Sequence, residues 1–396
     1  MGKKSFVLVI ALLFVICTGT AMAQALTDQE QLGKSLFFDQ KLSARNNQSC
    51  ASCHAPNVGW TGPIAGLNKG GSVYFGSIRQ RFGNRKPPTA AYGGDSPVLD
   101  QVDGTWVGGM FWDGRATGWT LGDPLAEQAQ GPFLNALEQA LPNASYVVDR
   151  VCTSKYSDLF IAVCGDGICD DVPVPAAYEC IARSIAAYER SAEVNPYSSK
   201  FDAYLAGQAE LTDQETLGRD LFEGKALCSA CHISDGQQAL FTDFTFDNLG
   251  VPRNPENPFY EQTDFNPDGL LWVDAGLGGF LRSVGEDYEA EMGKQKVPTL
   301  RNVDKRPGRG FVKAYSHNGY FKSLKGIVNF YNTRDVKPQC PDPFTTEADA
   351  LAQGCWPEPE VAANVNTGEL GNLGLTDEEE DAIVAFMTTL SDGFTP

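Results

Sequence analysis

Positive charge is scarce in this sequence. Its 396 residues include 31 Lys and Arg against 50 Asp and Glu, which gives a formal net charge of −19 at pH 7. A surface that binds nucleic acid needs a basic footprint, so this balance argues against DNA or RNA as a partner. It is compatible with solubility alone, and equally with a basic partner that is attracted by the field of the whole protein.

Long apolar runs are also missing. The run from Phe6 to Cys17 is too short for a membrane-spanning helix, which needs about 20 residues. Lys3 and Lys4 precede this run, and Ala21-Met22-Ala23 follows it with the small residues of a cleavage site. The order is typical of a secretory signal peptide, so we expect residues 1–23 to be removed and the mature chain to begin at Gln24. The sequence therefore predicts export to the periplasm without a stable membrane span.

Histidine is scarcer still, with three in the chain, at positions 54, 232 and 317. Two of them end the motifs Cys50-Ala51-Ser52-Cys53-His54 and Cys228-Ser229-Ala230-Cys231-His232. C-x-x-C-H is the attachment motif of a c-type haem: the thiols form thioether bonds to the porphyrin, and the histidine binds the iron. One copy could also be a thiol redox pair, but two copies in an exported chain favour two covalent haems. The predicted haem-binding residues are Cys50, Cys53, His54, Cys228, Cys231 and His232.

The two haem motifs belong to an internal duplication. Residues 26–37 and 211–222 precede them, and nine of the twelve positions are identical. Both segments open with T-x-x-E, the capping box that begins a helix, and a third such start occurs at Thr376. The fold class that this pattern predicts is mainly α, with two cytochrome c-like haem domains and long irregular loops. We expect the domains to cover residues 24–200 and 201–396.

Six cysteines remain after the four haem thiols and Cys17 of the signal peptide are set aside. An even number in an oxidising compartment indicates disulfides. Cys340 and Cys355 bracket one loop and are expected to pair. The other four, which are Cys152, Cys164, Cys169 and Cys180, are expected to form two bonds whose connectivity the sequence leaves open. A metal site with nearby aspartates is the alternative for these four.

The remaining motifs occur in a fixed order. F-W-D-G-R-A (residues 111–116) and E-Q-A-Q-G-P (127–132) lie between the haem motifs, and V-P-T-L-R-N-V (297–303) and Y-S-H-N-G (315–319) follow the second. This order resembles that of the bacterial di-haem cytochrome c peroxidases and their MauG-like relatives, over nearly the whole mature chain. The resemblance implies that hydrogen peroxide reacts at the first haem and that an external donor reduces the second. It also implies that the last helix packs back on the first domain, and it allows a homodimer.

The same resemblance implies roles for single residues. His54 and His232 correspond to the proximal iron ligands, and Tyr331 to the distal ligand of the second iron. Trp112 corresponds to an electron relay between the haems, Glu138 to the catalytic acid and Gln128 to a pocket glutamine. Each has a plainer interpretation: tryptophan and tyrosine on apolar faces are usually core, and glutamate is usually on the surface. Met110, Met292 and Met387 are the rival iron ligands, and Arg115 is a candidate partner of a haem carboxylate.

Two features depart from the family pattern. Peroxidases that need reductive activation hold a histidine on the distal side of the first haem, and here no histidine lies between His54 and residue 111. The family also places calcium between the domains, with an asparagine near Asn84. Lys86 stands at the matching position in this chain, which argues against calcium.

Three functions are consistent with these observations. The first is a cytochrome c peroxidase that reduces hydrogen peroxide to water with electrons from a basic small cytochrome c or copper protein. The second is a MauG-like oxidase that withdraws electrons from a partner protein or organic substrate. The third is a di-haem electron carrier, which would need ligands on both sides of both irons and for which histidine is too scarce.

Overall fold

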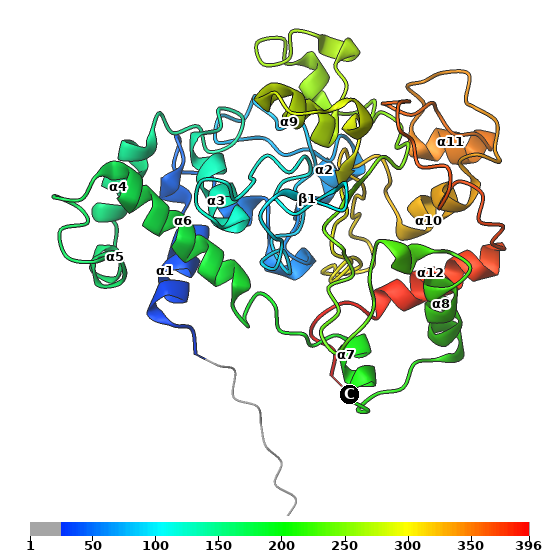
Figure 1. Ribbon diagram of the computed structural model, residues 1–396, viewed down its shortest axis with the longest axis horizontal. Helices are drawn as coiled ribbons and strands as arrows, with labels where there is room; N and C mark the ends of the chain where they lie inside the picture. Colours follow the sequence, from blue (N-terminus) through cyan, green and yellow to red (C-terminus); the bar gives the residue numbers. More distant parts are fainter. Residues whose placement is uncertain (1–24, 396) are drawn as a thin grey trace, which may run out of the picture.

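The structure is a computed structural model that describes residues 25–395, so the predicted signal peptide lies outside the described range. Its helices are α1 (Asp28–Phe37), α2 (Ala65–Lys69), α3 (Pro124–Leu134), α4 (Ala144–Cys152), α5 (Ser157–Cys164), α6 (Val174–Arg190), α7 (Lys200–Leu205), α8 (Asp213–Glu223), α9 (Gly276–Val284), α10 (Leu324–Thr333), α11 (Glu347–Gln353) and α12 (Asp377–Thr388). Two short antiparallel pairs complete the regular structure, β1 (Asp100–Val102) with β2 (Thr105–Val107), and β3 (Phe246–Asp247) with β4 (Gln295–Lys296). Long loops fill the middle of the molecule, between helices on either side (Figure 1). The predicted fold class, mainly α with irregular loops, is confirmed.

The duplication in the sequence is a duplication of helix pairs. Helix α1 packs against α6 in the first half, and α8 packs against α12 in the second. The predicted capping boxes are formed at Thr27, Thr212 and Thr376, so three of these four helices begin with the same local hydrogen bonds. Gly33 of α1 and Gly218 of α8 allow the close crossing, since a methyl group at either would collide with a carbonyl of the opposing helix.

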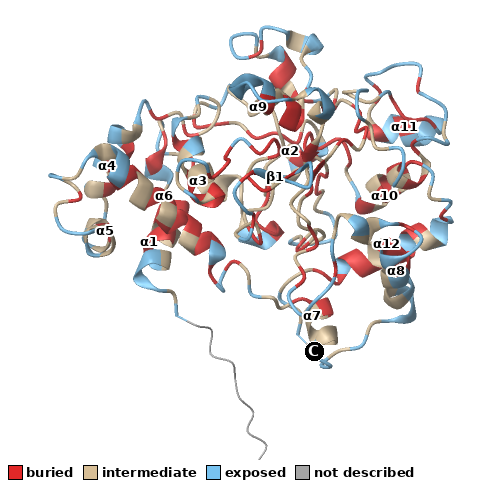
Figure 2. Cartoon of the chain, in the orientation of Figure 1, coloured by how far each residue is buried: buried red, intermediate tan, exposed pale blue. Residues whose placement is uncertain are grey.

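Each helix pair has its own aromatic core. In the first half Phe37, Trp60 and Tyr188 meet edge to face. In the second half Phe222 and Phe386 do the same. Buried residues also run through the central loops, which therefore belong to the interior (Figure 2). The boundary that we propose near residue 200 falls between the two cores, which are formed mainly by residues 32–194 and 201–390.

The last helix does not occupy the place expected for it. Helix α12 packs mainly against α8, with α10 beside it, and thus completes the second half. The expectation that it packs on the first domain is corrected, because its apolar side is needed to cover the α8 core. A contact with the first half is made by Asp392 beyond the helix end, which accepts a hydrogen bond of 2.8 Å from the hydroxyl of Tyr92.

The six remaining cysteines are all in disulfides. Cys340 pairs with Cys355, as predicted. The open connectivity is resolved as Cys152–Cys169 and Cys164–Cys180, which tie α4, α5 and α6 together. All four cysteines are therefore disulfide-bonded and have no free thiolate for a metal ion, so the alternative of a metal site there is wrong.

Buried ion pairs join the two halves. Arg85 donates two hydrogen bonds of 2.6 Å to Asp274 of the second half and pairs with Asp113 of the first at 2.6 Å. The guanidinium holds the pKa of both carboxyls below their usual range despite burial. The charges of this cluster are thus largely matched within the chain.

Candidate functional site

Two large cavities lie on either side of the junction between the halves. The first cavity, with about 1160 Å³ of space that is partly open to solvent, is lined by Cys50, Cys53 and His54 and by parts of α3 and α6. The second, with about 1720 Å³ of such space, is lined by Cys228, Cys231 and His232, by α10 and by the loops after β4. Lys86, Pro88, Thr89 and Trp112 line both, so these four residues form the wall between them.

The cysteines of the two cavities suit covalent haem. Among the described residues the free thiols are those of Cys50, Cys53, Cys228 and Cys231, while the other six cysteines are oxidised in pairs. Each thiol pair sits on one turn of 3-10 helix, which keeps both sulfurs at one edge of its cavity. This is the donor set that two thioether-bound porphyrins require.

The two histidines are prepared to bind a metal through one defined nitrogen. Nδ1 of His54 lies 2.9 Å from the carbonyl oxygen of Pro88, and Nδ1 of His232 lies 2.8 Å from that of Phe241. Each carbonyl accepts the Nδ1 proton, which leaves Nε2 as the free ligand atom. Burial lowers the pKa of His54 to about 4 and also lowers that of His232, so both rings are neutral, as ligands must be. The residues therefore fit a c-type haem in each cavity.

Glu138 lies in the turn that follows α3 and lines the first cavity. Asn135, the C-cap of α3, donates a hydrogen bond of 2.7 Å to its Oε1. Loss of solvation raises the pKa of Glu138, with the positive charge of Arg115 opposing the shift. The raised pKa makes the Glu138 carboxylate a stronger base than that of an exposed glutamate.

The other residues predicted for the first cavity are also in its wall. Gln128, on α3, and Arg115 both line it. The guanidinium carbon of Arg115 lies 3.9 Å from the centroid of the Phe111 ring. One of its nitrogens forms an ion pair with a carboxylate oxygen of Asp113 at 2.8 Å. Met110 lines this cavity as well, whereas His54 is its one histidine among the described residues.

Trp112 stands in the wall between the cavities and is 7% exposed. Its indole N–H donates a hydrogen bond of 2.8 Å to the carbonyl of Lys86. On the second-half side, its ring meets the edge of His317 at a centroid distance of 6.4 Å. His317 in turn has Nε2 3.6 Å from a carboxylate oxygen of Glu360.

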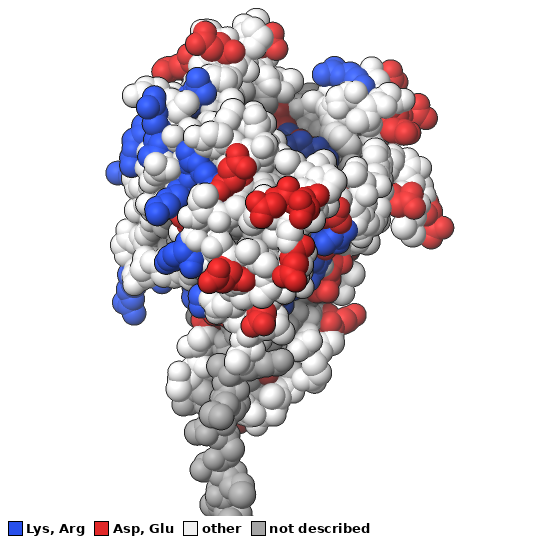
Figure 3. Space-filling view, turned by 90° about the vertical axis from the view of Figure 1, so that its left-hand side faces the viewer, with Lys and Arg blue, Asp and Glu red and all other residues white. Residues whose placement is uncertain are grey.

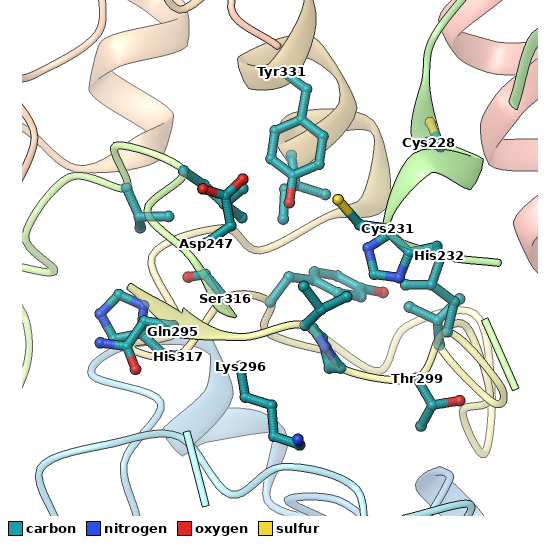
Figure 4. A pocket seen from close by; sticks show the side chains of 18 of the residues that line it. Cys228, Cys231, His232, Asp247, Gln295, Lys296, Thr299, Ser316, His317 and Tyr331 are labelled. Atoms are coloured by element: carbon teal, nitrogen blue, oxygen red, sulfur yellow. The ribbon is translucent and has the colours of Figure 1, made fainter. Parts of the chain in front are cut away.

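Tyr331 projects from α10 into the second cavity, where Figure 4 shows its hydroxyl between Asp247 and the haem-motif residues Cys231 and His232. The N-cap of α10 is Ser323, whose side chain accepts a hydrogen bond from the backbone N–H of Gly326. Burial, together with the neighbouring thiols and Asp247, raises the pKa of Tyr331, so the free phenol keeps its proton. Of the rival ligands, Met387 also lines this cavity.

Two residues of the site were not found from the sequence. Glu189 of α6 lines the first cavity, is 5% exposed, and has its pKa raised by burial to about 8. Lys86 was noted only as an obstacle to calcium, yet it lines both cavities. Glu189 follows Tyr188 on α6 as Met387 follows Phe386 on α12, so the repeated helix pair, and no local pattern around Glu189, is the signal that could have pointed to it.

Comparison with known proteins agrees with this geometry. Residues 27–210 match the family model described as di-haem cytochrome c peroxidase. The methylamine utilization protein MauG of Paracoccus denitrificans is 35% identical over 369 residues, covering 91% of this chain and 88% of that protein. The cytochrome-c peroxidase IdrP1 of Denitromonas iodatirespirans is 27% identical, with 92% of this chain and 81% of that protein covered.

A solved structure shows the same fold. The diheme peroxidase BthA of Burkholderia thailandensis superimposes with a TM-score of 0.76 at 27% identity, covering 94% of this chain and 88% of that one. Together with the two cavities, these matches identify the chain as a member of the di-haem cytochrome c peroxidase family that includes MauG, an oxidoreductase with two c-type haems.

Proposed function

We propose that the protein is a peroxidase that reduces hydrogen peroxide to two molecules of water, with two electrons from a small redox protein and two protons. The observation that carries the proposal is the placement of Glu138 in the cavity of the first C-x-x-C-H motif. The haem held by Cys50, Cys53 and His54 would supply the redox chemistry that cleaves an O–O bond.

The contribution of the protein is then to move one proton. Glu138 can take a proton from one oxygen of bound peroxide and return it to the other, which makes water the leaving group. Asn135 holds Oε1 of Glu138, and this bond leaves Oε2 as the atom that exchanges the proton. Gln128 and Arg115 are polar groups of the same wall that can orient the peroxide.

Trp112 is our candidate for the electron path between the two haems. It is the aromatic side chain in the shared wall, and its indole is fixed by the hydrogen bond to Lys86. Tyr331 and His232 are proposed as the two ligands of the second iron, and His54 as the protein ligand of the first. An open position on the first iron would admit peroxide without prior activation.

The electron donor is proposed to be a basic small cytochrome c or copper protein in the periplasm. The net charge of −19 attracts such a partner. On the face shown in Figure 3, most basic side chains lie in a band on the left, while acidic ones occupy the middle, the top and the right, so the charge is unevenly distributed there. Three disulfides agree with an oxidising compartment. No helix of residues 25–395 has the length and apolarity needed to cross a membrane.

Steady-state consumption of peroxide with a reduced basic cytochrome c tests the proposal. We expect turnover whose rate falls as ionic strength rises, because salt screens the attraction between the partners. An acidic cytochrome of similar potential is the control and should be a poor donor. Absence of peroxide consumption with any reduced donor would contradict the proposal.

Tyr331 favours a second candidate, a MauG-like oxidation of a partner protein or organic molecule. An anionic oxygen ligand stabilises oxidised iron, so the second haem could hold oxidising equivalents rather than pass electrons inward. Peroxide would then take its two electrons from the substrate. Slow bleaching of the haem spectrum by peroxide without donor turnover, reversed by an added oxidisable substrate, would favour this candidate over the peroxidase.

A further inference from the structure

Lys86 occupies the junction between the two haem cavities. It lines both of them, and its backbone links the halves: its N–H donates to the carbonyl of His317 at 2.8 Å, and its carbonyl accepts from Trp112 at 2.8 Å. The backbone is therefore fixed from both sides, and the side chain has little freedom to leave the wall.

The ammonium group of Lys86 has only neutral partners in the protein. Nζ donates to Oγ1 of Thr61 at 3.3 Å and to the carbonyl of Pro87 at 3.1 Å. Its third N–H has no acceptor among the described residues, and no carboxylate in that part of the chain forms an ion pair with it. Burial lowers the pKa of Lys86 to about 8, which still leaves the group mostly charged at pH 7.

Two neighbouring cations, Arg85 and Lys313, are better satisfied than Lys86. Arg85, the preceding residue, is neutralised by Asp274 and Asp113. Lys313 is buried without a carboxylate but satisfies all three N–H groups on carbonyls, one of them from Val58 across the junction. The charge of Lys86 adds to the desolvation that lowers the pKa of Lys313, so the two amino groups are close enough to interact electrostatically.

An ammonium group removed from water is costly unless an anion compensates it. The described chain supplies no such anion to Lys86, although acidic residues outnumber basic ones by 50 to 31. A haem carries two carboxylate groups at the edge of its ring, and a haem in either cavity has Lys86 in its wall. The missing counter-charge is therefore that of the cofactor.

We propose that Lys86 is a fixed cation shared by the two haem sites, which binds a haem carboxylate with its free N–H and raises the reduction potential of both haems. A positive charge close to the ring favours the reduced state of the iron, because that state is less positive. In this protein the ammonium group thus serves as the cation between the domains, and no metal ion is needed there.

Potentiometric titration of the holoprotein, followed by its optical spectrum, tests the proposal without peroxide. Lys86→Met should lower the midpoint potentials of both haems, while Lys86→Arg should stay close to the wild type. Lys296 provides the matched control, because it lines the second cavity alone. Lys296→Met should therefore change the second haem and leave the first unchanged. Unchanged potentials in Lys86→Met, or a shift confined to one haem, would overturn the shared role.

Three further experiments decide the cases that Lys86→Met alone leaves open. If Lys86→Met fails to incorporate haem, Lys86→Gln should still load and show the same two shifts, and its potentials then decide. Resonance Raman bands of the haem carboxylates should move in the Lys86→Gln variant and not in Lys86→Arg. Treatment of the wild type with a calcium chelator should leave both potentials unchanged; a loss that added calcium restores would show that a metal supplies the cation and would refute the proposal.

Discussion

Replacement of Glu138 by glutamine isolates the proton transfer from the geometry of the first cavity. Glutamine has the same shape, and its Oε1 can still accept the 2.7 Å hydrogen bond from Asn135. What disappears is the capacity to take up and release a proton. We expect the haem spectrum to be unchanged and peroxide turnover to fall by about 10²- to 10⁴-fold, the usual effect of one positioned acid–base group. This corresponds to about 3–5 kcal/mol in the barrier at 1.36 kcal/mol per decade.

The pH profile gives a second signature of the same group. Burial raises the pKa of Glu138, so the acid limb of the wild-type profile should lie above that of an ordinary glutamate. If Glu138 acts as the base, activity is lost as pH falls through this pKa, and the limb should be absent from the residual activity of Glu138→Gln.

Glu189→Gln is the matched control for this experiment, since Glu189 is the other desolvated carboxyl of the cavity. We expect its turnover to stay within a few-fold of the wild type. Turnover of Glu138→Gln within a few-fold of the wild type, or an equal loss in both variants, would refute the reasoning that assigns the proton to Glu138.

Further expectations follow from the wall between the cavities and from the buried carboxyl of α6. Trp112→Phe should keep both haems but slow the reduction of the first after peroxide oxidises it, and an unchanged stopped-flow rate would exclude the relay. Tyr331→Phe should turn the second haem high-spin in ferric EPR and leave the first unaltered; a second haem that stays low-spin would point to another ligand. The resting ferric protein should consume peroxide without prior reduction, and EPR that shows two low-spin haems together with activity only after partial reduction would contradict this. The folded pKa of Glu189 is about 8 against an ordinary 4.5, so the folded state keeps a proton that the unfolded chain loses, and stability falls as pH rises through this window. Glu189→Gln should therefore raise the unfolding temperature more at pH 8 than at pH 5, whereas Glu179→Gln, in the same helix but paired at the surface, should show no such difference.

The sequence predicted those parts of the molecule that depend on local chemistry. The capping boxes at Thr27, Thr212 and Thr376 begin helices because their hydrogen bonds close within four residues. Leu324 and Tyr331 are seven residues apart, a spacing that places them on one helical face, and both line the second cavity. In these cases a short stretch of chain contains all the interacting groups.

What the sequence could not provide depends on distant partners. The pairing of Cys152 with Cys169 rather than with a nearer cysteine is decided by how α4, α5 and α6 pack. The position of α12 depends on the apolar face of α8, about 160 residues away. The exposure of Glu189 to the first cavity and of Lys86 to both is likewise a property of the assembled halves, since neither side chain carries a local signal of burial.

The duplication explains how one scaffold can support two different haem environments. In both halves a glycine of the first helix faces a carbonyl of the second, at Ser184 in α6 and at Ala382 in α12. Five residues after each of these carbonyls, the chain presents a side chain to its cavity: Glu189 in the first and Met387 in the second. The repeated position is therefore a buried titratable carboxyl in the first cavity and a buried, uncharged thioether in the second. The same glycine-to-carbonyl crossing positions the backbone of α6 in the first half and of α12 in the second. A substitution at this position in one half therefore changes the polarity of one haem site, while the helix pair of the other half stays as it is.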